Sequence, residues 1–321
     1  MRAAREAVDI VFDGATKRYP GRRAPAVDDL TFSIQAGEIC CLVGPSGGGK
    51  TTAMKLVNRL VELTSGDVRI DGRSVRDLDP TELRRGIGYV IQQVGLFPHM
   101  TVAENVATVP RLLGWRRDEI RPRVDELLDL VDLPAVDYRS RYASQLSGGE
   151  RQRVGLARAL AADPPVMLMD EPFGALDPIT RARLQKELLR IQGEVQKTIV
   201  FVTHDIDEAI LIGDRIAILR EGGRLVQVDT PERLLARPAD EFVERFVGED
   251  RGLKRLSLTT LAEVELDPPS DIVTPTAGAE TTLRDALSLM LSEGSRSLLV
   301  LDADERPRGV LTFDRLSELL R

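Results

Sequence analysis

A glycine-rich stretch, GPSGGGKTT at residues 44 to 52, carries the clearest chemical signal in the sequence. It fits the pattern G-x-x-x-x-G-K-[ST] and lies between an apolar run, ICCLV, and a helix-like run, TTAMKLVNRL. In that context glycines let backbone N–H groups close around phosphate oxygens, the lysine reaches the β- and γ-phosphates, and the threonine hydroxyl holds Mg²⁺. A plain glycine-rich turn would not need Lys-Thr at this place. The predicted phosphate-binding residues are Gly44, Pro45, Ser46, Gly47, Gly48, Gly49, Lys50, Thr51 and Thr52.

Two carboxylates follow another apolar run, VMLM, at residues 166 to 169. This pattern predicts a buried strand whose carboxyl end carries Asp170 and Glu171. Successive side chains of a strand point in opposite directions, so the two carboxylates should do different jobs. Asp170 suits Mg²⁺, and Glu171 suits polarising an attacking water. An acidic pair at a strand end is usually a solvated turn, but the phosphate loop favours the catalytic interpretation.

A histidine ends a third apolar run, TIVFVTHD at residues 198 to 205. A single histidine is more often structural than catalytic, and the only other one is His99. In parallel sheets, however, ligands bind beyond the carboxyl ends of the strands. We therefore predict that His204 touches the γ-phosphate.

The stretch QLSGGERQRV, residues 145 to 154, predicts a helix start with a second anion-binding feature. Ser147 and Glu150 have the spacing of a capping box, S-x-x-E, which explains both residues without any ligand. It does not explain Gly148 and Gly149, which weaken a helix start but let a phosphate approach the backbone. A capped helix can still offer its end to an anion, and because the chain's own pocket lies upstream, that anion should belong to another copy.

Length and composition limit the classes of protein that this chain can be. With 321 residues, 42% of them hydrophobic and 30% charged, it is long enough for two domains, or for one large domain and a small appendage. A net charge of −7 argues against a cationic nucleic-acid surface, so no nucleic-acid partner is expected. No apolar run approaches the ~20 residues that cross a bilayer, and the first residues lack the apolar core of a signal peptide.

The elements that position these motifs can be read from the hydrophobic pattern. Short apolar runs alternating with helix-like stretches predict an α/β domain with a largely parallel sheet. Alternating residues early in the chain predict a small, partly antiparallel sheet, and residues 96–145 predict a helical insertion. A small β–α–β–β–α-like unit follows a boundary near residue 250. Cys40 and Cys41 lie in an apolar run and are expected to be reduced core residues, with neither a disulfide nor a metal role.

In this order, GPSGGGKTT, LSGGE, MLMDEP, ALD and THD resemble the ATP-binding subunit of an ABC transporter over roughly residues 8 to 248. The resemblance implies a P-loop NTPase fold in residues 1–249: a RecA-like parallel sheet core, an antiparallel β subdomain and a helical subdomain at about 96–160. It further implies ATP and Mg²⁺ as cofactors and two copies packed head to tail. Each ATP would then lie between the phosphate loop of one copy and Ser147, Gly148 and Gly149 of the other.

Other residues take roles only through this resemblance. Tyr19, in TKRYP, matches the aromatic residue that stacks on adenine, although an exposed surface tyrosine is the alternative. Gln92, in YVIQQVGLFPH, matches a glutamine that contacts Mg²⁺ and water and links the site to membrane subunits. Asp177, in GALD, matches a loop that crosses the dimer interface. Gly48 departs from the family, which often has serine there, and backbone contacts to phosphate should survive the change.

Three longer stretches narrow the resemblance to the energising subunit of quaternary-amine importers, whose cargo is glycine betaine, carnitine, choline or proline betaine. They are LVNRLVELTSGDVRIDG, RRGIGYVIQQVGLFPHMTVAENV and FVTHDIDEAILIGDRIAIL. The resemblance implies a homodimer at the cytoplasmic face of the cell membrane, on two permease subunits, with a substrate-binding protein as an indirect partner.

The tail, residues 250–321, resembles a cystathionine-β-synthase-like (CBS) regulatory unit, α+β in class. It has room for about one repeat, whereas the relatives carry a pair, so a single unit would have to pair across the homodimer. In GVLTFDRL the spacing of Thr312 and Asp314 is shorter than the family's nucleotide-binding pattern, which argues against binding of an adenosine nucleotide.

Two other functions remain open on the sequence. One is a soluble ABC ATPase of translation or DNA repair, although such chains often hold two nucleotide-binding halves or long coiled-coil insertions, and this chain has neither. The other is a nucleotide-responsive regulatory protein that binds ATP without appreciable hydrolysis. The transported solute itself is not encoded here, because selectivity lies in other subunits.

Overall fold

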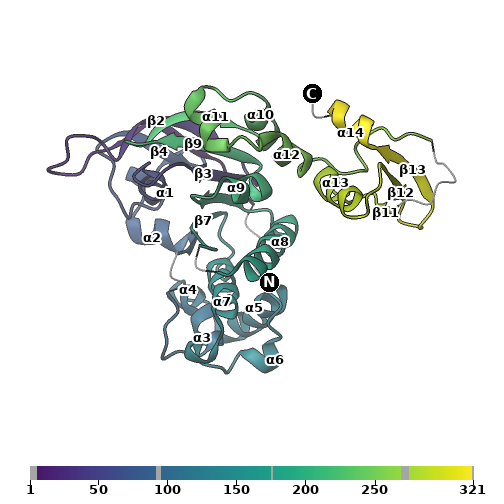
Figure 1. Cartoon of the computed structure of the whole chain (residues 1–321). Coiled ribbons are helices and arrows are strands. Elements are labelled where there is room, and N and C mark those ends of the chain that lie inside the picture. The colour runs from purple at the N-terminus through teal and green to yellow at the C-terminus, as the bar shows by residue number, and fades with distance from the viewer. Residues whose placement is uncertain (1–5, 92–94, 175, 269–274, 320–321) are drawn as a thin grey trace. The chain divides into compact units, whose positions relative to one another are not determined.

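The structure is a computed structural model that describes residues 6–91, 95–174, 176–268 and 275–319 (Figure 1). The chain divides into two compact units, Met1–Asp229 and Thr230–Arg321. The boundary predicted at 249/250 concerns functional domains; it lies later in the chain than this division and stays a prediction.

An antiparallel sheet begins the first unit. Its strands are β1 (Ile10–Lys17), β2 (Val27–Ile34), β4 (Ser65–Ile70) and β5 (Arg73–Ser74), in the order β2-β1-β4-β5. Phe12 on β1 pairs with Phe32 on β2, and their rings stack with centroids 4.9 Å apart. Phe12 is fully buried, as expected for one face of an alternating strand. The antiparallel sheet predicted from the early alternation is confirmed.

A second sheet of six strands holds the predicted motifs. It contains β3 (Ile39–Val43), β6 (Ile87–Val90), β7 (Val166–Asp170), β8 (Thr198–Val202), β9 (Arg215–Arg220) and β10 (Arg224–Asp229), in the order β10-β9-β3-β8-β7-β6. All neighbours pair in parallel except β9 and β10. Every residue of β3, β7 and β8 is buried, which explains their continuous apolar runs.

Cys40 and Cys41 lie on β3, and their thiols are free and buried, so the prediction that they are core residues is confirmed. Burial raises the pKa of both thiols. A buried, protonated thiol is a poor nucleophile and packs as a small hydrophobe.

The helices of the first unit fall into two groups. Around the sheets lie α1 (Lys50–Val57), α2 (Pro80–Arg85), α8 (Pro178–Val195) and α9 (Ile206–Ile212). A separate helical lobe, at the bottom of Figure 1, contains α3 (Val102–Val106), α4 (Thr108–Leu112), α5 (Arg117–Leu130), α6 (Ala135–Tyr138) and α7 (Gly148–Leu160).

The helical insertion is thus confirmed, with one difference in detail. The first predicted helix starts at Val102, because Thr101 forms a capping box with Glu104, and it divides at Ala107 into α3 and α4.

The second unit begins with three short helices, α10 (Pro231–Ala236), α11 (Glu241–Val247) and α12 (Arg251–Leu256). There follow β11 (Thr276–Gly278), α13 (Leu283–Ser292), β12 (Ser297–Leu301), β13 (Pro307–Thr312) and α14 (Phe313–Leu319). This is the predicted β–α–β–β–α order. Buried Leu283, Met290 and Leu298 belong to a core of its own.

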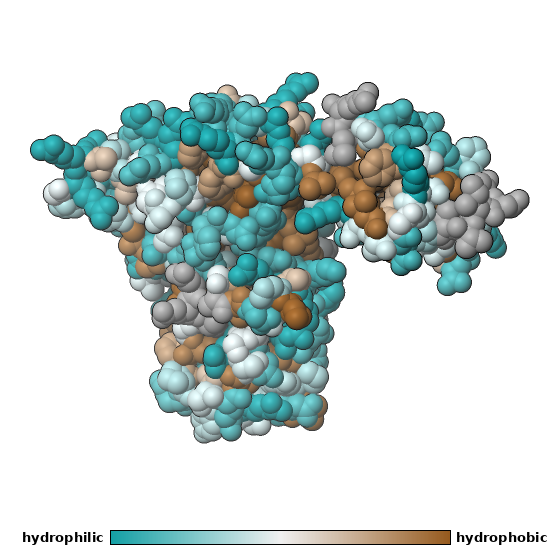
Figure 2. All heavy atoms as spheres, in the orientation of Figure 1, coloured by the Kyte–Doolittle hydropathy of each residue, from teal (hydrophilic) through white to brown (hydrophobic). Residues whose placement is uncertain are grey.

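Hydrophilic residues cover most of the face seen in Figure 2, with apolar residues in smaller groups. Among the helices that the structure describes, none has both the length and the apolar character needed to span a bilayer.

Candidate active site

The glycine-rich loop follows β3 and leads into α1, as predicted. Gly49 has φ 77°, and a Cβ atom there would lie 2.1 Å from the carbonyl oxygen of Ala26. Only glycine fits such a left-handed position against another backbone. Gly48 has no positive φ, so its backbone suits an ordinary residue, although a Cβ would lie 3.0 Å from the Pro45 carbonyl oxygen. The backbone conformation at Gly48 thus does not require glycine, but a side chain there would need the Pro45 carbonyl to shift slightly.

Lys50 is held inside the loop. Its Nζ donates to the carbonyl oxygens of Gly44, at 2.8 Å, and Pro45, at 2.9 Å, and the residue is only 7% exposed. Burial lowers the pKa of Lys50, and the charges of Glu171 and Asp170 act in the opposite direction. The ammonium group is thus oriented by main-chain oxygens and lies within electrostatic reach of both predicted carboxylates.

Thr51 and Asp170, 119 residues apart in the sequence, meet at the floor of the site. The Thr51 hydroxyl donates to Asp170 Oδ1 at 2.9 Å. Asp170 is 9% exposed, and burial raises its pKa while the Thr51 hydrogen bond lowers it. Hydroxyl and carboxylate oxygens are ligands that Mg²⁺ prefers, so these two residues fit the predicted metal. The third predicted ligand, Gln92, lies outside the described residues.

Glu171 does not continue strand β7. Its φ of 45° turns the chain out of the sheet, and its N–H donates to the Val202 carbonyl at 2.9 Å. The strand alternation from which different roles were predicted therefore does not extend to Glu171, although the two carboxylates do have different partners, and their different roles stay a prediction. Glu171 Oε2 lies 3.3 Å from Nδ1 of His204, whose side chain is 63% exposed.

An open hollow of about 440 Å³ lies beyond the carboxyl ends of β3, β7 and β8, and Asp170 is not among the residues that line it. Its lining consists of Ser46, Gly47, Gly49, Lys50, Thr51, Thr52, Glu171 and His204. The hollow combines main-chain donors, a lysine, a carboxylate and an imidazole, which is a set suited to a polyphosphate and an activated water.

Other predicted residues lie outside this lining. Tyr19 is half-buried, with Lys17 Nζ 5.1 Å from its ring centroid. The capping box at the start of α7 is confirmed, since Ser147 Oγ accepts from the Glu150 N–H and Glu150 Oε2 accepts from the Ser147 N–H. Ser147 and Gly148 are exposed and Gly149 is half-buried. Asp177 caps α8 by accepting from the N–H groups of Ile179 and Thr180.

Sequence reasoning missed a polar cluster directly behind Glu171 and His204. Arg181, Thr203, Asp205 and Glu208 line a cavity of about 20 Å³ together with those two residues, Phe173 and Gly174. Asp205 adjoins His204 in the motif THD, and this adjacency was the available signal. The sequence carried no signal for Arg181, because nothing in the residues of α8 indicates that they lie beside the residues that follow β8.

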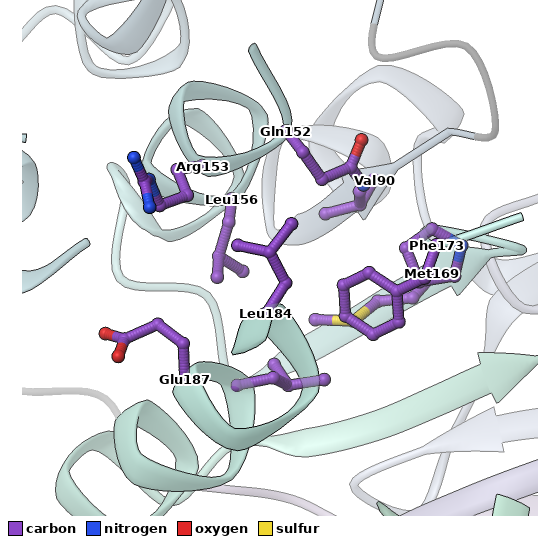
Figure 3. Close-up of a pocket in the computed structure, with 10 residues that line it drawn as sticks. Val90, Gln152, Arg153, Leu156, Met169, Phe173, Leu184 and Glu187 are labelled. Carbon is purple, nitrogen blue, oxygen red and sulfur yellow. The ribbon is translucent and has the colours of Figure 1, made fainter. Parts of the chain in front are cut away.

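A separate pocket, between β6, α7 and α8, is apolar. Figure 3 shows Leu156, Met169, Phe173 and Leu184 around it, with Arg153 and Glu187 together at one side. Although Gln152, Arg153 and Glu187 belong to its lining, the surface that faces the pocket is almost entirely apolar and does not suit a phosphate. It is therefore a feature of packing between these elements and not part of the candidate active site.

Two protein-family models match separate parts of the chain. A family model described as "ABC transporter" matches residues 27–174, and one described as "CBS domain" matches residues 268–321.

Curated relatives match nearly the whole chain. Osmoprotectant import ATP-binding protein OsmV of Salmonella typhimurium is 48% identical over 94% of this chain and 78% of its own length. Choline transport ATP-binding protein OpuBA of Bacillus subtilis is 50% identical over 92% of this chain and 76% of its own. Glycine betaine uptake system ATP-binding protein YehX of Escherichia coli is 47% identical over 96% of this chain and 98% of its own.

Solved structures support the fold. The dimeric structure of MJ0796, a bacterial ABC transporter cassette, has a TM-score of 0.61 and 37% identity, and covers 69% of this chain and 98% of that one. The structure of cbiO1 from Clostridium perfringens, part of the ABC transporter complex cbiONQ, has a TM-score of 0.67 and 26% identity, and covers 78% and 94%.

Proposed function

Since this chain belongs to the family of ATP-binding subunits of ABC transporters, we propose that it hydrolyses ATP to power uptake of an osmoprotectant quaternary amine. The cargo class is that named for the relatives: glycine betaine, choline or carnitine. The observation that carries the hydrolytic part is the single hollow shared by the phosphate loop, Glu171 and His204.

The chain's own residues suggest a division of labour. Main-chain N–H groups of the loop would cradle the phosphates, and Lys50 would exchange its bonds to the carbonyls of Gly44 and Pro45 for phosphate oxygens. Glu171 would orient and polarise the attacking water. His204, 3.3 Å from Glu171, would hold Glu171 in place and contact the γ-phosphate. Thr51 and Asp170 would hold Mg²⁺, with Gln92 as a further ligand; when bound, the ion neutralises charge that develops on the phosphate oxygens.

The complete site is proposed to need two copies. Ser147 and Gly148 are exposed at the start of α7, and neither they nor Gly149 lines the hollow of their own chain. The capping box orders this helix end, so its N–H groups and dipole can receive the γ-phosphate of a second copy. The dimeric cassette of MJ0796 supports such an arrangement. Asp177 would cross the interface beside it, and Tyr19 would stack on adenine.

Outside the ATPase unit, the proposal extends to partners and regulation. The homodimer would sit at the cytoplasmic face of the membrane on two permease subunits, with a substrate-binding protein acting on the far side. Residues 250–321 would form the CBS-like regulatory domain. Because the Thr312 hydroxyl donates to Asp267 Oδ2 at 3.2 Å and its spacing to Asp314 is short, we expect no adenosine nucleotide there.

The test is ATP turnover by the purified full chain over a wide range of concentrations. The specific rate should rise with protein concentration, because each site needs both copies. Glu171→Gln should keep ATP binding, accumulate an ATP-bound dimer and lower turnover by about 10²–10⁴-fold. A specific rate that is constant on dilution to monomer would contradict the shared site, and full activity of the variant would remove Glu171 from catalysis.

The same preparation separates the alternatives. Phosphate release from ATP excludes a protein that only senses nucleotide. Co-purification with integral membrane subunits supports the importer, and co-purification with ribosomes would contradict it.

A further inference from the structure

We propose that Arg181 is a positioning residue that connects the α7 helix start, which serves the ATP of the second copy, to His204 of its own site. This inference rests on the proposed function and deepens it. It concerns how the two ATP sites of the dimer are coupled, and it rests on a series of contacts within a single copy.

The first contact joins the start of α7 to the start of α8. A Cβ atom built on Gly149 would lie 3.2 Å from Cγ2 of Thr180, and one built on Gly148 would lie 4.0 Å from Cδ2 of Leu176. The backbone at the anion-binding end of α7 is therefore in close contact with the segment that leads into α8. A displacement of this end toward α8 would press on Thr180, the nearer of the two, and through it on the segment that contains Leu176.

Arg181 carries the connection onward. Its Nη2 donates to the Leu176 carbonyl at 3.3 Å, and its Nη1 lies 3.6 Å from Oδ2 of Asp205. The guanidinium group thus holds a main-chain oxygen with one arm and faces a carboxylate with the other. This is a planar fork geometry that lysine does not reproduce.

Asp205 transfers the constraint to His204. Asp205 Oδ1 caps α9 by accepting from the N–H groups of Asp207 and Glu208, and the Asp205 N–H donates to Thr203 Oγ1 at 3.0 Å. His204 therefore lies between two residues that are fixed to each other. Its Nδ1 faces Glu171, so a displacement of Asp205 changes the place of the imidazole relative to the carboxylate.

Arg181 also has an electrostatic effect on the carboxyl groups that line the small cavity. Glu171, Asp205 and Glu208 all line it, and among its lining residues only Arg181 is a permanent cation. Burial raises the pKa of Glu208, and the charge of Arg181 acts in the opposite direction. Removing Arg181 takes the permanent cation out of a lining that contains three carboxyl groups, which changes the electrostatic environment of Glu171.

A merely structural role predicts something different from a positioning role. The Arg181 side chain is 33% exposed, and ion pairs of that exposure add little to folding stability. Arg181→Gln should therefore leave the melting temperature and the KM for ATP unchanged while kcat falls about tenfold, since small misplacements of catalytic groups reduce the chemical step. Arg181→Lys should recover part of kcat, because it restores the charge without the fork.

The experiment uses the full chain with Arg183→Gln as the matched control, because Arg183 is an exposed arginine on the same helix. Dimerisation is measured in parallel by light scattering, with Glu171→Gln introduced into both variants so that ATP is retained. We expect Arg181→Gln to dimerise like the control and to turn over about tenfold more slowly. In a cycle with Asp205→Asn, which keeps the capping oxygen, the two losses should not add.

Equal kcat for Arg181→Gln and Arg183→Gln would overturn the inference. So would a fall in kcat that is accompanied by a raised KM for ATP and a lowered melting temperature. Additive losses in the cycle would overturn the route through Asp205. An inactive wild-type chain would instead overturn the proposed function, and this inference with it.

Discussion

Replacing Gly49 with alanine measures how strongly the phosphate loop depends on the close approach of backbone segments. Gly49 and Gly47 share a left-handed conformation, with φ 77° and 81°. They differ in surroundings, because a Cβ on Gly47 meets nothing within 4 Å, whereas one on Gly49 lies 2.1 Å from Ala26 O and 2.9 Å from Gly223 Cα. Gly47→Ala is therefore a matched control that carries the conformational strain alone.

The magnitudes follow from these surroundings. A left-handed conformation costs a non-glycine residue about 1–2 kcal/mol, so Gly47→Ala should lose about that much unfolding free energy. At Gly49 the obstructing atoms are main-chain atoms, and their displacement should add an overpacking cost of about 1–3 kcal/mol. The expected loss for Gly49→Ala is about 2–5 kcal/mol. The entropy that alanine removes from the unfolded chain is similar in both variants and cancels in their difference.

The assay is urea denaturation of the nucleotide-free chain, followed by the fluorescence of Trp115. This is the only tryptophan, and it lies in the same compact unit as the loop. Nucleotide is omitted because binding would stabilise the folded state and mask the difference. Equal unfolding free energies for the two variants would refute the reasoning, since they would show that contact with Ala26 and Gly223 does not constrain the loop.

Two further predictions concern the dimer and the metal site. Ser147→Arg should abolish ATP hydrolysis, because a large side chain blocks the exposed end of α7, while ATP binding by the single chain persists in equilibrium titration; normal turnover would contradict the shared site. Asp170→Asn should abolish turnover but raise the free energy of unfolding at neutral pH. Burial holds the folded-state pKa of Asp170 above the usual 3.8, so ionisation of this carboxyl opposes folding at higher pH. The gain should shrink as the pH falls through that raised pKa, and a gain in urea denaturation that stays constant from pH 7.5 down to the ordinary value of 3.8 would contradict this cause.

The motifs and the local elements were predictable from the sequence. Helix α8 begins at Pro178, after its Asp177 cap, and α7 follows the capping box of Ser147 and Glu150. These signals act between residues a few positions apart, so they are visible in any window of the chain. The continuous apolar runs of β3, β7 and β8 likewise predict that these strands are buried.

The turn at Glu171 shows where such reasoning stops. Alternation along a strand predicted that Asp170 and Glu171 face opposite ways, but the strand ends between them and Glu171 takes φ 45°. Its N–H bonds to Val202 on the neighbouring strand. The conformation of Glu171 is thus tied to a hydrogen bond with another strand, which a local window of the sequence does not contain.

The sequence by itself determined the inventory of this protein: a phosphate loop, a pair of carboxylates, a histidine and a capped helix with two glycines, each at the end of a strand or the start of a helix. Only the tertiary structure determined which of these residues are in contact, such as Thr51 with Asp170, Glu171 with His204, and Arg181 with Asp205. The physical reason is that the register of parallel strands, with Asp170 opposite Val202, brings these ends to one edge of the sheet. That register is set by the packing of the whole core and not by the residues that it brings together.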